Sequence, residues 1–80
     1  MKLKPIATEK AIMMIEKGNL ILFETEKERT KPEIAKEIEG IFDVKIEKIR
    51  TLVRKNKKYA YVKLKKEFPA IDIATKLGMM

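Results

Sequence analysis

The fold is decided by residues 44–65, which read VKIEKIRTLVRKNKKYAYVKLK. Two runs of alternating apolar and polar residues flank the polar stretch 54–58, and this pattern predicts two antiparallel strands joined by a turn. Asn56 suits a left-handed backbone conformation within that turn. The segment therefore predicts a β-hairpin.

The first strand of this hairpin changes phase. Ile49 and Val53 fall on one face of an alternating strand, whereas Val44 and Ile46 fall on the other. Because a shift of one residue exchanges the two faces of a strand, we expect a bulge or a late strand start near 47–48.

The second strand has one apolar face and one mixed face. Ala60, Val62 and Leu64 alternate on the apolar face. The other face carries Tyr59, Tyr61, Lys63 and Lys65. Tyrosine rings stack on unpaired bases, and lysines pair with phosphates. The alternative, left open by the sequence, is that one or both rings pack beneath the last helix.

Three helices are expected around the hairpin. The clearest start is at Thr30, which can cap a helix, while Glu33 completes a capping box and Pro32 lies in the first turn. The three helices are expected to begin after Thr8, Thr30 and Pro69 and to end near Gly18-Asn19, Gly40 and Gly78.

The remaining apolar segments predict two more strands. Residues 20–23 (LILF) form a continuous apolar run, which predicts a strand buried on both faces. Residues 3–6 are expected to add a short edge strand. The order (β)αβαββα predicts an α+β fold in which helices pack on an antiparallel or mixed sheet. At this length, residues 1–80 are expected to form a single domain.

The positive charge is concentrated in one segment. The formal net charge is +7, yet residues 45–66 hold ten basic side chains against one acidic, whereas residues 1–44 hold eight basic and nine acidic. Such segregation costs self-repulsion, which a polyanion would offset. A solvated basic face without a partner is the first alternative. An anionic membrane is a weaker one, because the segment alternates like strands and contains no basic amphipathic helix.

The composition argues against catalysis. Serine, histidine and cysteine are absent, which excludes most nucleophile–base pairs and the usual transition-metal ligands. Glu24, Glu26 and Glu28 could in principle hold a hard cation, but Lys27 and Arg29 between and beside them indicate a solvated strand end. No apolar run is long enough for a signal peptide or a membrane span. We expect a cytoplasmic protein with no enzymatic activity, cofactor, metal, membrane insertion or small-molecule substrate.

Several short motifs, in a fixed order, resemble a known family. The motifs are Pro5-x-x-Thr8-Glu9-Lys10, TKPEI at 30–34, FDVKI at 42–46, RTL at 50–52 and KKYAYVKL at 57–64. Together they resemble the family of large ribosomal subunit protein L23 over essentially the whole chain, most closely in its short archaeal-type form. One departure is Tyr59, which stands where the family usually has the second of two basic residues before the alanine.

The resemblance implies a structural constituent of the large ribosomal subunit. Its β-(α)-β-α-β-β domain would bind large-subunit ribosomal RNA near the rim of the polypeptide exit tunnel. It would neighbour ribosomal protein L29 and help to dock nascent-chain factors such as the signal recognition particle. In bacterial relatives the glutamate of the Thr/Ser-Glu-Lys motif helps to dock a chaperone, which makes Glu9 a candidate protein-docking residue. The short stretch 54–58 argues against the tunnel-lining loop of those relatives.

The predicted RNA-binding residues combine the basic segment with its tyrosines and one lysine of the first motif. They are Lys10, Lys45, Lys48, Arg50, Arg54, Lys55, Lys57, Lys58, Tyr59, Tyr61, Lys63, Lys65 and Lys66. Two other functions remain as alternatives: a small α/β-sandwich enzyme acting on an anionic substrate, and a regulatory dimerisation module.

Overall fold

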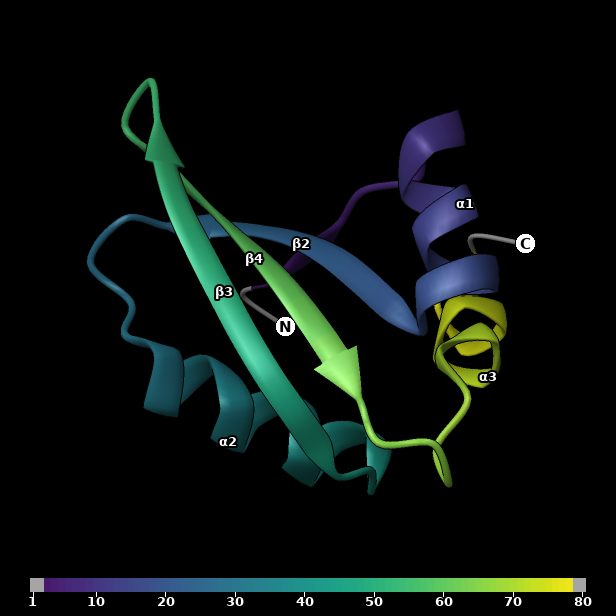
Figure 1. Ribbon diagram of the computed structural model, residues 1–80. Helices are drawn as coiled ribbons and strands as arrows, with labels where there is room; N and C mark the ends of the chain where they lie inside the picture. Colours follow the sequence, from purple (N-terminus) through teal and green to yellow (C-terminus); the bar gives the residue numbers. More distant parts are fainter. Residues whose placement is uncertain (1–2, 79–80) are drawn as a thin grey trace.

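Residues 44–65 form the expected hairpin in the computed structural model, which describes residues 3–78 (Figure 1). The hairpin belongs to a four-stranded antiparallel sheet with the order β1-β2-β4-β3. The strands are β1 (Lys4–Pro5), β2 (Leu20–Glu26), β3 (Ile46–Arg54) and β4 (Lys57–Leu64). β4 is therefore a central strand, while β3 and the two-residue β1 form the edges.

The hairpin turn is tighter than the sequence suggested. Arg54 pairs with Lys57, so only Lys55 and Asn56 connect the strands, in place of the predicted stretch 54–58. Both have positive φ, 52° and 65°, as a two-residue type I′ turn requires. Asn56 was predicted to be left-handed, whereas Lys55, which lacks the usual turn chemistry, was not.

The predicted bulge is confirmed by the pairing of β3 with β4. The register shifts between Ile46 and Lys48, so the residues on either side of the shift alternate in opposite phase. Next to it, the Glu39 carboxylate of the second helix accepts a hydrogen bond from the Ile46 N–H (3.0 Å). This bond satisfies a backbone donor at the beginning of the edge strand.

The three helices supply one side of a single core. They are α1 (Glu9–Gly18), α2 (Lys31–Phe42) and α3 (Ala70–Lys76). Ile15, Ile38 and Ile73, one from each helix, are buried in one cluster with Phe23 and Val62 of the sheet. All three helices thus lie on the same face of the sheet, and the α+β class is confirmed. None of them, within residues 3–78, has the length and apolar character of a membrane span.

The prediction of a strand buried on both faces is wrong for residues 20–23. Ile21 and Phe23 are buried at 1% and 0% exposure, whereas Leu20 and Leu22 are half-buried. The cause is the one-sided arrangement of the helices, which leaves the second face of β2 uncovered. An apolar run cannot distinguish this arrangement from a strand between two helix layers.

The helix boundaries follow local capping chemistry. Thr8 accepts a hydrogen bond from the Ala11 N–H at the start of α1, as predicted. α2 passes through Gly40, the predicted end, and stops where Asp43 adopts a left-handed conformation (φ 54°). Gly78 follows α3 with φ 75°, consistent with its predicted capping position.

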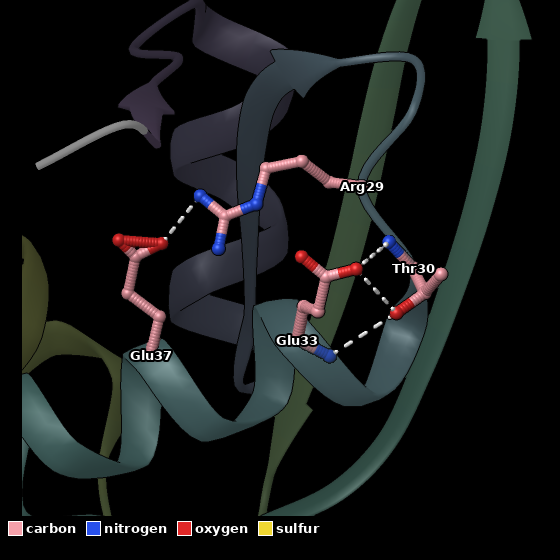
Figure 2. Close-up of polar contacts among 4 residues, drawn as sticks. All are labelled: Arg29, Thr30, Glu33 and Glu37. Carbon is pink, nitrogen blue, oxygen red and sulfur yellow. Dashed lines mark hydrogen bonds and ion pairs between the residues drawn. The ribbon is translucent and has the colours of Figure 1, made fainter.

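The start of α2 is fixed by two sets of polar contacts (Figure 2). Thr30 and Glu33 form the predicted capping box, in which each side chain accepts from the other residue's backbone N–H. The guanidinium of Arg29 pairs with the Glu37 carboxylate at 2.6 Å, with both side chains mostly buried. The Arg29 carbonyl accepts a 2.6 Å hydrogen bond from the Lys58 ammonium, which ties β4 to this loop.

Asn19 joins two segments that are distant in the sequence. It ends α1 in a left-handed conformation (φ 56°). Its side-chain Nδ2 lies 3.1–3.2 Å from the carbonyl oxygens of Leu64, Lys65 and Phe68, and its Oδ1 accepts from the Ala70 N–H at 2.6 Å. One side-chain amide therefore provides hydrogen-bond partners for several backbone groups of the linker between β4 and α3.

Substitutions of Asn19 are expected to destabilise the fold in two separable ways. Asn19→Gly keeps the left-handed conformation but removes the side-chain bonds, and should lower the free energy of unfolding by about 2–3 kcal/mol. Asn19→Ala should lower the free energy of unfolding by roughly 1 kcal/mol more than Asn19→Gly does, because alanine disfavours the left-handed conformation. Urea denaturation of both variants measures the difference. A loss below about 0.5 kcal/mol in Asn19→Gly would show that water replaces these bonds at little cost.

Candidate nucleic-acid interface

The face of the sheet opposite the helices is here called the open face. Its position follows from β4, where Ala60, Val62 and Leu64 are buried under the helices and the alternate residues point the other way. The strand register then places the residues of the open face as Leu20, Leu22, Glu24, Lys48, Arg50, Leu52, Arg54, Lys57, Tyr59, Tyr61 and Lys63.

Both tyrosines lie on the open face. Tyr61 is in register between Leu22 and Arg50, and Tyr59 lies between Glu24 and Leu52. Each tyrosine is half-buried. Since α3 packs on the opposite face, the alternative in which a tyrosine packs beneath the last helix is wrong. The rings remain accessible from the helix-free side.

Like charges face each other across the hairpin. Lys48 pairs with Lys63, and Arg54 pairs with Lys57, on opposite strands. Each like-charge pair destabilises a sheet. Among the described residues on this face, only Lys57 has an opposite charge nearby, because its ammonium lies 3.6 Å from the Glu24 carboxylate. The fold therefore concentrates cations where they repel one another.

α1 adds a cation and an apolar wall to the open face. A hollow of about 450 Å³ is lined by Lys10 and Met14 of α1 together with Leu20, Arg50 and Tyr61 of the sheet. Lys10 and Met14 are four residues apart, so they lie on the same side of the helix. The fold thus brings Lys10 next to residues about 40 positions later in the chain.

The other predicted RNA-binding residues lie outside this face. Lys45 precedes β3, Lys55 is in the turn, and Lys65 and Lys66 follow β4; all four are exposed. Lys58 differs from them, because its ammonium is part of a hydrogen bond to the Arg29 carbonyl on the helix side. The predicted set is therefore divided between the open face, the two ends of the hairpin and one structural contact.

The acidic residues considered in the sequence occupy surface positions. Glu9 is exposed in the first turn of α1, where its carboxylate interacts favourably with the helix dipole. Glu24 lies on the open face, whereas Glu26 and Glu28 are exposed at and beyond the end of β2. Within residues 3–78, no three carboxylates gather closely enough to hold a metal ion.

Sequence reasoning missed the apolar part of the interface. Leu20 and Leu22 were assigned to a strand buried on both faces, Met14 was assigned to the apolar stripe of the first helix, and Leu52 was not considered. All four line hollows of the open face. Leu52 is 37% exposed. A signal was available for Leu52, because it alternates with Arg50 and Arg54 and so shares their face.

Comparisons with known proteins agree with the motifs. The family model described as Ribosomal protein L23 matches residues 1–71. One curated relative is the large ribosomal subunit protein uL23 of Pyrobaculum aerophilum. It is 43% identical over 76 residues, which cover 94% of each chain.

Relief of the Lys48–Lys63 repulsion should stabilise the free protein. Lys63→Gln is expected to raise the free energy of unfolding by about 0.2–1 kcal/mol at low salt, with the gain shrinking at high salt. Lys36→Gln removes the same charge from the exposed surface of α2 and is the matched control. Thermal unfolding in low and high salt measures both. Equal shifts in the two variants would contradict a local cross-strand effect.

Proposed function

We propose that this chain, which belongs to the ribosomal protein L23 family, binds large-subunit ribosomal RNA through the open face of its sheet. As a member of that family it is a structural protein of the large ribosomal subunit, located in the cytoplasm within the ribosome. The family is structural rather than enzymatic. We propose further that residues 1–80 act as one RNA-binding domain.

The observation that carries the RNA-binding proposal is the grouping of uncompensated cations around accessible tyrosines. A surface that gains nothing from its charges in the free protein would gain from phosphates, because each contact releases counterions and relieves repulsion. Lys10, Arg50 and Lys63 come from α1, β3 and β4 and border this face. RNA shape, rather than a base-by-base code, would then set the specificity.

The exposed cations at the ends of the hairpin would extend the contact. Lys55 lies at one end, and Lys45, Lys65 and Lys66 lie at the other. Lys58 is left out of this part of the proposal, because its ammonium donates a hydrogen bond to the Arg29 carbonyl on the helix side of the sheet. We propose that the domain lies at the rim of the exit tunnel, as its family resemblance implies. A turn made of Lys55 and Asn56 is too short to extend far into the tunnel.

We also propose that α1 contributes to a protein-docking surface, with ribosomal protein L29 and the signal recognition particle as partners. Glu9 and Met13 are four residues apart, and both side chains are exposed, Met13 at 52%. An acidic residue followed by an exposed apolar one suits a protein partner better than it suits a phosphate backbone.

The salt dependence of binding tests the RNA proposal. If about six phosphates of irregular ribosomal RNA are contacted, log affinity should fall with log salt at a slope near −4. Arg50→Gln should make the slope shallower by about 0.7, because one phosphate contact is lost. Lys36→Gln is again the control and should leave the slope unchanged. A wild-type slope shallower than about −1 would contradict an electrostatic interface.

Crosslinking within isolated large subunits tests the two surfaces separately. Photocrosslinkers at Lys63 and at Met13 should attach mainly to RNA and mainly to protein, respectively. RNA crosslinks from both positions would contradict the docking proposal for α1. Sedimentation of the free chain addresses the dimerisation alternative, which requires a stable homodimer. A phosphatase assay addresses the enzyme alternative.

A further inference from the structure

The hollows of the open face meet at one side chain. Tyr61 lines three of them, with volumes of about 260, 450 and 230 Å³. They extend from Tyr61 toward Tyr59, toward α1 and toward Lys63. Its ring is therefore reachable from several sides, although the residue is half-buried in the sheet.

The surroundings of Tyr61 combine apolar contact with positive charge. Leu20, Met14 and Leu52 line the hollow toward α1, and Lys10 and Arg50 lie at the same hollow. Lys48 and Lys63 line the next one, together with Arg50. A flat apolar group placed on the ring would thus have cations around it that suit an attached phosphate backbone.

Tyr59 has the same chemistry but a different environment. It faces the Glu24 carboxylate across the β2–β4 pairing, and that carboxylate also pairs with Lys57. The hollow of about 260 Å³ that Tyr59 lines contains Arg54 as its cation. Two cations and one carboxylate therefore lie around Tyr59, whereas the described side chains lining the hollows toward α1 and Lys63 include four cations and no carboxylate around Tyr61. An anionic backbone is thus favoured more beside Tyr61 than beside Tyr59, so the two rings are not equivalent.

We propose that Tyr61 is the stacking platform for an unpaired RNA base, with Lys10, Arg50 and Lys63 contacting the phosphates next to it. The inference rests on the proposed RNA binding and narrows it to a class of RNA element. Bases within a duplex are already stacked and present no free face to a ring, whereas loops, bulges and single strands do. The ligand of this site is an unpaired segment.

The chain offers a direct readout of this site. It has no tryptophan and only two tyrosines, both of which lie on the open face. Tyrosine fluorescence therefore reports on these two rings alone. A short single-stranded RNA of mixed sequence should quench the emission, and the quenching should remain in Tyr59→Phe and be lost in Tyr61→Phe.

Affinity measurements on the full chain separate stacking from charge. Tyr61→Leu should weaken binding of the single-stranded RNA by about five- to hundredfold, whereas Tyr61→Phe, which keeps an aromatic ring, should stay within about twofold. The salt slope should be unchanged in both, because no cation is removed. Tyr59→Leu is the matched control and should lose less. Thermal unfolding of each variant verifies the fold, since neither tyrosine belongs to the core.

The two proposals fail in different ways. Equal binding of the single strand and of a duplex made from the same sequence would overturn the stacking site, as would an unchanged affinity in folded Tyr61→Leu; RNA binding as such would stand in either case. A greater loss of affinity in Tyr59→Leu than in Tyr61→Leu would show that Tyr59, and not Tyr61, is the stacking platform. Absence of binding to both RNAs and to ribosomal RNA, at low salt, would remove the proposed function itself.

Discussion

The Asn19 amide joins the end of α1 to the linker between β4 and α3, and the rest of the core is built around this connection. Its bonds to the backbone of Leu64, Lys65, Phe68 and Ala70 hold the end of β4 and the beginning of α3 against the junction between α1 and β2. The Asn19 carbonyl also accepts from the Leu64 N–H (3.2 Å), which continues the pairing of β2 with β4. Because this pairing sets the register, it also decides which side chains flank Tyr61. The open face thus depends on a contact made at the other end of the strand from the turn.

The alternation of β4 assigns its two faces to different tasks. Ala60, Val62 and Leu64 are at most 1% exposed and complete the core. The residues between them carry the rings and ammonium groups of the proposed RNA interface. A strand with this pattern allows the chemistry of one face to change at little cost to the packing of the other, since successive side chains point in opposite directions. The bulge between Ile46 and Lys48 performs a related task on β3, because it gives Ile46 and Ile49 to the core despite their odd spacing.

Much of the fold was predictable because its signals are local. The capping box of Thr30 and Glu33, the phase change before Lys48 and the alternation of β4 each lie within a few residues, and all are confirmed. The errors and omissions depend on distant partners. Leu20 and Leu22 were expected in the core, because a sequence does not state that all helices will pack on one face. The hydrogen bond from the Lys58 ammonium to the Arg29 carbonyl was not foreseen, because nothing near Lys58 in the sequence indicates that partner. The approach of Lys10 to Arg50 likewise exists only once α1 is packed beside the sheet.

The edge position of β3 has a consequence for the chain before it meets a partner. A nine-residue strand with one unpaired side is a template on which another copy could add its own strand. The bulge interrupts that template, and the Glu39 carboxylate already accepts a hydrogen bond from the Ile46 N–H. The cations of β3 would also repel an identical strand brought alongside. The cations of β3 that belong to the proposed RNA interface thus have a second effect, since they disfavour strand addition between free copies of the chain.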